Sequence, residues 1–252
     1  MGRFGVLGAT SWGTTLAWLL ACNGHDVWLL CRDGTEARRV DAARGLARLP
    51  GLVLSDSVAI VEAARCPVAI DGLIVAVPAQ AAAKALSEAA LPRSTAILSA
   101  AKGIDHTSRL RMSELCGAAG WQEDHVAVLS GPNLAKEVVA GLPAAGVVAS
   151  ASEATAEAWQ RALSRPAFRL YTSPDVVGVE LCGSLKNVVA IAAGSAIGLG
   201  FGANAVAAIL TRGLAEMTRL GLALGAQRPT FQGLAGVGDL AATCYSPLSR
   251  NR

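Results

Sequence analysis

The start of the chain constrains the fold most, because it alternates apolar strand-like stretches with a helical one across a glycine-flanked turn. Residues 3–7 and 26–31 are the apolar stretches, and residues 14–22 between them have helical character. The turn at residues 8–13 reads Gly-Ala-Thr-Ser-Trp-Gly. A strand, a glycine turn, a helix and a second strand make a βαβ unit, whose helix N-terminus can receive a pyrophosphate. We therefore expect an α/β fold able to bind a dinucleotide.

The turn matches the dinucleotide pattern GxGxxG imperfectly. Gly8 and Gly13 hold its first and third positions, but Thr10 holds the second, where the backbone approaches phosphate most closely. An ordinary tight turn between a strand and a helix would look similar, so this motif alone leaves both interpretations open.

The residue after the second predicted strand bears on cofactor choice. NAD-selective sites carry an acid there to hold the ribose 2′-hydroxyl, whereas this chain has Arg32. A guanidinium suits the 2′-phosphate of NADP, although an arginine at this position could also simply face solvent. The sequence therefore favours NADP and leaves NAD open.

The alternation of strands and helices continues to about residue 171. Further strands are predicted at residues 52–54, 73–77, 95–99, 125–130, 143–149 and 167–171, and helices at residues 35–48, 56–65, 80–89 and 153–164. From Pro174 onward the apolar periodicity is helical. We predict a doubly wound sheet domain of the Rossmann type in residues 1–174, followed by an all-helical substrate domain in residues 175–252.

Two polar residues follow predicted strands, where doubly wound sheets bind their ligands. Lys102 comes just after the strand at residues 95–99 and can meet an anionic substrate or cofactor. Asn133 follows the strand at residues 125–130 and is expected to cap a helix whose start could hold an anion. A capped helix without any ligand is equally consistent with this segment.

Lys186 heads an uncharged, Gly-rich run at residues 188–210. An ammonium in apolar surroundings loses hydration, so its pKa falls and it can exchange a proton near neutral pH. A lysine at a helix end can instead extend its ammonium into solvent. The run is long enough to span a bilayer, but its glycines, Ser195 and Asn204 favour a buried helix broken by a turn.

Composition argues against several classes of protein. Of the 252 residues, 52% are hydrophobic and 16% charged, with a net charge of +3, which indicates a well-buried globular protein. No run of lysine and arginine exists, so we expect neither nucleic acid nor an electrostatic membrane anchor as a partner. Scattered cysteines without a CxxC pair predict reduced thiols in a cytoplasmic protein and no metal site. The apolar stretch at the start is too short for the core of a signal peptide, so we expect no targeting segment.

Near the end of the chain, Asp239 lies in a glycine-rich stretch that we expect to be a flexible loop. Ser249, Arg250 and Asn251 follow it. Arg250 can bind a phosphate through two parallel hydrogen bonds, with Asn251 as a neutral neighbour, although a polar tail would look the same.

Together, a series of segments in order resembles one family. They are GATSWG at 8–13, AKG at 101–103, SGPNLAKE at 130–137, LKNV at 185–188, GFG at 200–202, TRGLAEM at 211–217, GVGD at 236–239 and SRNR at 249–252. The family is the bacterial NAD(P)-dependent glycerol-3-phosphate dehydrogenases, and the resemblance covers the whole chain. It implies reversible hydride transfer between C2 of sn-glycerol 3-phosphate and the nicotinamide of NAD or NADP. The product would be dihydroxyacetone phosphate, and the glycerol 3-phosphate would supply phospholipid synthesis.

The resemblance also implies residue roles. Lys186 would accept the proton and Lys102 would polarise the developing oxyanion. Cofactor contacts would come from Ser11, Trp12, Arg32, Lys102, Ala135 and Arg250, with Gly8 and Gly13 shaping the turn. Substrate contacts would come from Lys102, Gly131, Asn133, Lys186, Asp239, Ser249, Arg250 and Asn251.

The chain departs from the family pattern at Thr10, Ile197 and Val206, and family members continue past Arg252 with further helices. We therefore expect an incomplete helical domain whose apolar faces depend on a partner chain, for example in a homodimer. Two other functions stay open. One is a two-domain dehydrogenase acting on a hydroxy acid or an acyl thioester, and the other is a nucleotide-binding relative without turnover.

Overall fold

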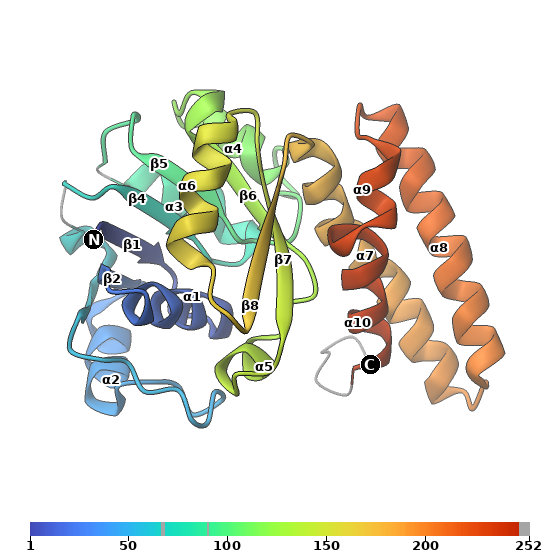
Figure 1. Cartoon of the computed structure of the whole chain (residues 1–252), viewed down its shortest axis with the longest axis horizontal. Helices are drawn as coiled ribbons and strands as arrows, with labels where there is room; N and C mark the ends of the chain where they lie inside the picture. Colours follow the sequence, from blue (N-terminus) through green and yellow to red (C-terminus); the bar gives the residue numbers. More distant parts are fainter. Residues whose placement is uncertain (67–68, 90, 247–252) are drawn as a thin grey trace.

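A single eight-stranded sheet organises the N-terminal part of the chain in the computed structural model, which describes residues 1–66, 69–89 and 91–246 (Figure 1). Its strands are β1 (Arg3–Leu7), β2 (Asp26–Cys31), β3 (Val58–Glu62), β4 (Gly72–Val75), β5 (Ala96–Ser99), β6 (Val126–Ser130), β7 (Ala144–Ser150) and β8 (Phe168–Ser173). The strand order is β3-β2-β1-β4-β5-β6-β7-β8, and every pairing is parallel except that of β6 with β7. The predicted Rossmann-type α/β class is confirmed.

Helices cover both faces of this sheet because its strands are apolar on both sides. They are α1 (Ser11–Cys22), α2 (Gly34–Ala43), α3 (Ala79–Glu88), α4 (Met112–Ala118), α5 (Ala135–Val139) and α6 (Glu153–Leu163). Val6 packs in one core with residues of α1 and α6, and its neighbour Leu7 packs in the other core with residues of α3 and α4. Successive strand residues point to opposite faces, so β1 contributes to both cores.

The two halves of the sheet meet between β1 and β4, because the chain lays β2 and β3 on one side of β1 and then crosses over to form β4 on the other side. Leu7 at the end of β1 pairs with Leu30 of β2 on one side and with Val75 of β4 on the other. The carboxyl ends of the three strands are therefore level, and the strand order reverses there. Such a switch point is where doubly wound sheets leave a crevice for ligands.

Helices alone follow β8 in the described part of the chain, as the periodicity after Pro174 predicts (Figure 1). They are α7 (Val176–Gly198), α8 (Ala203–Ala223), α9 (Arg228–Gln232) and α10 (Asp239–Tyr245). The predicted break in the apolar run is confirmed, because Gly200 has φ of +82° between α7 and α8. Lys186, however, lies near the middle of α7 and not at a helix end.

Helix α7 is the one described helix that is long and apolar enough to cross a membrane, with a mean hydropathy of 1.6 in its best window. Within that window 56% of the residues are buried inside the protein. The helix packs against α8, α10 and β6, as a core helix of a globular protein would.

The predictions for residues 44–65 are wrong. Residues 56–65 form the edge strand β3 and a short 3-10 turn, not a helix, because Val58, Ile60 and Val61 pair with β2 in a parallel ladder. Helix α2 stops at Ala43, since Arg44 takes a left-handed conformation with φ of 46°. Its guanidinium donates to the carbonyls of Leu54 and Val58.

Residues 52–54 form no strand, although Leu52 and Leu54 are buried in the core. Helix α4 was not predicted. Its amphipathic pattern is short, and Met112, Leu115 and Cys116 are buried against the sheet by tertiary packing.

Close approach of α8 to α9 depends on Gly221. A Cβ at this position would lie 2.1 Å from the ring of Phe231, which is fully buried and cannot move aside. We expect Gly221→Ala to lower the free energy of unfolding by about 1–3 kcal/mol through overpacking. The measurement is thermal denaturation, with a decrease in Tm of about 2–4 °C per kcal/mol.

Gly198→Ala is the matched control, because a Cβ there meets no atom within 4 Å at the end of α7. Alanine has the higher helix propensity, so this variant should melt at the wild-type temperature or slightly above it. Equal melting temperatures for all three proteins would contradict the proposed close packing at Gly221.

Candidate functional site

The turn between β1 and α1 is built on two glycines that allow close backbone approach. Gly8 has φ of +110°, and a Cβ there would lie 2.9 Å from the side chain of Val77. Gly13 lies against Gly8, since its Cβ would come within 2.1 Å of the Gly8 carbonyl oxygen. No other residue type fits either position without moving the backbone, so both glycines are required for this turn.

Thr10 is the N-cap of α1. Its Oγ1 accepts a hydrogen bond from the Gly13 N–H at 3.0 Å and donates one to the Ala76 carbonyl at 2.9 Å. The hydroxyl at the family's middle-glycine position therefore satisfies a helix N–H and ties the turn to the end of β4.

A cavity of about 710 Å³ opens beside this turn. Residues 7–10 and Leu30, at the ends of β1 and β2, line one side, and residues of α3 line another. Arg32 and Arg48 also line it. The Arg32 side chain is 81% exposed and donates to Asp33 at 3.1 Å. The cavity has the volume of a cofactor pocket, and its position at the switch point fits the adenosine half of a dinucleotide.

The other predicted cofactor residues lie near this turn. Ser11 begins α1, and Trp12 packs its ring edge-on against Phe168. The Trp12 indole N–H is buried without a partner among the described residues. Ala135 begins α5, which contacts α1.

Three segments distant in sequence meet at a buried group of charges that we call the lysine–aspartate centre, formed by Lys102, Lys186 and Asp239. Lys102 follows β5, Lys186 is on α7, and Asp239 begins α10. One Asp239 oxygen, Oδ2, accepts a hydrogen bond from Lys102 Nζ at 2.7 Å, and the other accepts from Lys186 Nζ. Two ammonium groups therefore share one carboxylate that is only 4% exposed.

Both ammonium groups have further partners. Lys102 Nζ donates to the Gly131 carbonyl at 2.9 Å and to Asn133 Oδ1 at 3.1 Å. Lys186 Nζ donates to Thr243 Oγ1 at 2.8 Å. The structure thus brings together the predicted substrate residues Lys102, Gly131, Asn133, Lys186 and Asp239.

Asn133 is not the helix cap that the sequence predicts. Helix α5 begins two residues later with Leu134 as its N-cap, and with five residues it is too short to act as an anion site. The side-chain oxygen Oδ1 of Asn133 instead accepts from the Lys102 ammonium, which forms a stronger hydrogen bond than a backbone N–H does. Its Nδ2 is buried and has no partner within the described residues, so it is a donor free to bind a ligand oxygen.

Burial controls the acidity of Lys186. The residue is 6% exposed, which excludes the alternative that its ammonium extends into solvent. Loss of hydration, followed by the charge of Lys102, lowers its pKa to about 8, and Asp239 opposes the shift. An amine with this pKa is populated in both protonation states near neutral pH and can therefore exchange a proton with a ligand.

Sequence reasoning missed Thr243 and Ser130. Thr243 donates to the Asp239 carbonyl at 2.7 Å as well as accepting from Lys186, and Ser130 Oγ lies 3.5 Å from Asp239 Oδ2. The prediction of a flexible loop around Asp239 is wrong, because a π-helical turn (Leu234–Gly238) leads directly into α10. Thr243 is one helical turn after Asp239, so recognising α10 would have found it. Ser249, Arg250 and Asn251 lie outside the described residues.

Family models match both parts of the chain. The NAD-dependent glycerol-3-phosphate dehydrogenase N-terminus matches residues 3–156, and the C-terminus of the same enzyme matches residues 175–252. Together they cover most of the sequence.

Individual relatives agree with these models. A glycerol-3-phosphate dehydrogenase of the NAD(P)+ type from Corynebacterium diphtheriae is 46% identical, over 99% of this chain and 77% of its own length. One from Frankia casuarinae is 48% identical, over 100% of this chain and 76% of its own length. The crystal structure of glycerol-3-phosphate dehydrogenase from Coxiella burnetii superposes with a TM-score of 0.89 at 35% identity, over 99% of this chain and 78% of its own. The chain therefore belongs to the NAD-dependent glycerol-3-phosphate dehydrogenase family.

Proposed function

We infer that this chain interconverts sn-glycerol 3-phosphate and dihydroxyacetone phosphate with NAD or NADP, and we propose that the lysine–aspartate centre performs the proton transfer. The observation that carries the assignment is Lys186, an amine buried beside Lys102 with a pKa lowered to about 8. The direct test is the loss of NADPH absorbance when dihydroxyacetone phosphate is added, with NADH run in parallel. Binding of NADPH without turnover would favour a nucleotide-binding relative instead.

Oxidation of a secondary alcohol removes a hydride from carbon and a proton from oxygen. A bound nicotinamide would supply the acceptor for the hydride of C2. Lys186 in its neutral form takes the hydroxyl proton on Nζ, and in the reverse direction its ammonium returns that proton to the C2 oxygen. The Lys102 ammonium stabilises the negative charge that develops on this oxygen in the transition state.

The remaining assignments are proposals drawn from the family resemblance. Gly131, Asn133 and Asp239 would bind the substrate hydroxyls, and the free Asn133 Nδ2 supports this role. Ser249, Arg250 and Asn251 would bind the phosphate, with Arg250 also touching the cofactor. The cofactor would lie along the turn formed by Gly8, Ser11, Trp12 and Gly13, with Ala135 and Lys102 near the nicotinamide and Arg32 near the 2′-phosphate.

We further propose a dinucleotide-binding domain in residues 1–174, a substrate domain in residues 175–252, and a cytoplasmic enzyme, without membrane insertion, that supplies phospholipid synthesis. A homodimer is proposed because apolar side chains on α7 and just after it are solvent-facing. Val188 and Ile191 of α7 are 69% and 55% exposed, and Leu199, the residue after the helix, is 73% exposed. Such a row favours contact with another apolar surface.

Replacement of Lys186 tests the proton-transfer role. Lys186→Met keeps the length of the side chain and removes the amine, while Asp239 keeps Lys102 as its partner. We expect kcat to fall by about 10²–10⁴, the usual contribution of general acid–base catalysis, with the Kd for NADPH unchanged. Lys136→Met is the control, since Lys136 is exposed on α5. Wild-type turnover by Lys186→Met would rule out this role.

The pH dependence of the two directions should be opposite. Oxidation of glycerol 3-phosphate needs neutral Lys186, so its kcat/KM should rise with pH and level off above a pKa of about 8. Reduction of dihydroxyacetone phosphate needs the ammonium, so its kcat/KM should fall above the same pKa. Steady-state rates across the neutral and alkaline range measure both. Profiles that change in the same sense in both directions would contradict the assignment.

Arg32 tests the preference for NADP. Arg32→Ala should lower kcat/KM for NADPH at least about tenfold, because a charged hydrogen bond to the 2′-phosphate contributes about 1.5–3 kcal/mol. The value for NADH should stay near wild type. Arg38→Ala, on the exposed side of α2, is the control. Equal losses with both cofactors would show that Arg32 does not read the 2′-phosphate.

A further inference from the structure

Helix α7 carries a second buried ionic contact, distinct from the lysine–aspartate centre. Glu180 lies six residues before Lys186, and its side chain is 6% exposed. The carboxylate accepts hydrogen bonds from Arg111 Nη1 at 2.7 Å, from the Ser113 N–H at 2.8 Å and from Ser113 Oγ at 2.5 Å. All three donors belong to the start of α4, so this contact joins the helical part of the chain to the sheet part.

Burial of the Glu180 carboxylate would cost folding free energy if its hydrogen-bonding partners were absent. Loss of hydration raises the pKa of Glu180, while the hydrogen bonds from Ser113 and the charge of Arg111 oppose the shift. A packed apolar residue would hold two elements together at least as well, and a buried ion pair is weak evidence for stability. Compared with an apolar contact, the ion pair fixes the orientation of the two elements, because hydrogen bonds from a planar guanidinium and a backbone N–H determine the position of the carboxylate.

The same contact leads back to Lys102. Arg111 forms an antiparallel bridge with Ile104, and the Asp105 N–H donates to the Leu110 carbonyl at 3.0 Å. Ile104 is two residues after Lys102. These contacts close residues 104–111 into a loop. Lys102 lies just before the start of this loop, and Glu180 binds Arg111 at its end.

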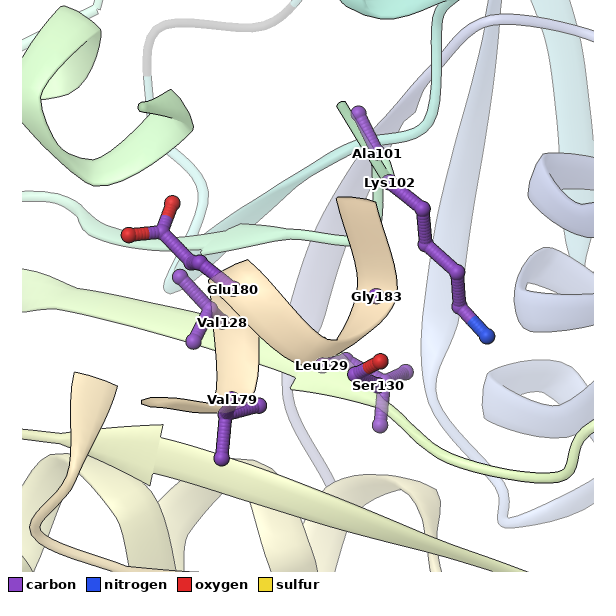
Figure 2. Close-up of a pocket in the computed structure, with 8 residues that line it drawn as sticks. All are labelled: Ala101, Lys102, Val128, Leu129, Ser130, Val179, Glu180 and Gly183. Carbon is purple, nitrogen blue, oxygen red and sulfur yellow. The ribbon is translucent and has the colours of Figure 1, made fainter. Parts of the chain in front are cut away.

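Gly183 sits between the two charged contacts. A Cβ there would lie 2.8 Å from Ser130 Oγ and 3.4 Å from Lys102 Cγ, so α7 rests directly on the end of β6 and on the stem of Lys102. Figure 2 shows Glu180 and Lys102 on opposite sides of this part of α7, with Gly183 beside Lys102. The void among these residues is only about 10 Å³, room for a single water.

We propose that Glu180 is a positioning residue for the hydride-transfer reaction. Its contact with Arg111 and Ser113 fixes the rotation of α7 about its own axis and its distance from the sheet, so that Lys186 and Lys102 bind the two oxygens of Asp239. Residues 180, 183 and 186 are spaced three apart, so the direction in which they project turns by about 60° at each step and by about 120° from Glu180 to Lys186. Fixing the first two determines where the third projects. A displacement of a catalytic group by about 1 Å can reduce a rate about 10²-fold, so the anchor acts on turnover.

The test is Glu180→Gln, which keeps the shape and an oxygen for Ser113 but removes the charge that holds Arg111. We expect kcat for dihydroxyacetone phosphate reduction to fall at least tenfold, with the KM for NADPH within twofold of wild type. Looser packing of α7 would also hydrate Lys186, so the apparent pKa of the rate should rise above about 8. The groups facing that amine, Lys102 and Asp239, are unchanged in the variant.

Glu114→Gln is the matched control, because Glu114 binds the other Arg111 nitrogen, Nη2, at 2.9 Å from the exposed side. It should retain wild-type kcat and pH profile. Ser113→Ala is the milder second variant if Glu180→Gln fails to fold. It removes the 2.5 Å contact of Ser113 Oγ and the hydrogen bond that this hydroxyl accepts from Arg111 Nη1 at 3.3 Å, but it leaves the contacts of Glu180 with Arg111 and with the Ser113 N–H. It should lower kcat in the same way but by less.

A lower melting temperature with wild-type kcat and pH profile in the folded Glu180→Gln or Ser113→Ala enzyme would overturn the proposal, because the anchor would then be purely structural. The proposal rests on the role of Lys186 inferred above, and the two can fail separately. Wild-type turnover in Lys186→Met would refute that role, whereas unchanged kinetics in Glu180→Gln beside an inactive Lys186→Met would refute only the positioning role.

Discussion

The buried carboxylate of Asp239, shared by Lys102 and Lys186, is the interaction on which the arrangement of this site depends. Charges removed from water are tolerated only when they are paired and hydrogen-bonded, so Lys186 and Asp239 cannot be buried unless all three segments meet. The same burial lowers the pKa of Lys186 to about 8. The contacts that bring the helices onto the sheet therefore also set the acidity of the amine that we propose to be catalytic.

Glycines make this meeting possible by letting backbones approach where a side chain would hold them apart. Gly183 lets α7 rest on Ser130 and Lys102, Gly13 brings α1 onto the Gly8 carbonyl, and Gly221 lets α8 contact Phe231. Each of these glycines allows a close contact between two elements and does not act as a flexible joint. The charged groups then lie within hydrogen-bonding distance because these elements are already close, and the Glu180–Arg111 contact fixes the orientation of α7 on the side away from Lys102.

Much of the fold could be predicted because apolar runs and glycine turns are local signals. The strands around residues 3–7, 26–31 and 95–99 were predicted nearly to the residue, since buried parallel strands leave continuous apolar runs. The errors occurred where pairing partners distant in sequence decide the structure. Val58–Glu62 is a strand because it pairs with β2 in a parallel ladder. Asn133 does not cap a helix as expected, because its side-chain oxygen accepts from the Lys102 ammonium, a stronger donor than a backbone N–H. Thr243 was missed because α10 was taken for a loop, although it lies one turn from Asp239.

The sequence by itself determined the class of fold, the family and the residue types needed for the chemistry, because these follow from local patterns and from motifs in a fixed order. It also indicated that Lys186 would lie among apolar residues. Only the tertiary structure decided which charges share a partner, that Thr10 donates to the Ala76 carbonyl, and that Glu180 ties α7 to α4. Those facts depend on distances between segments tens of residues apart or more. Such distances are set by the packing of whole helices on the sheet, which no local pattern in the sequence specifies.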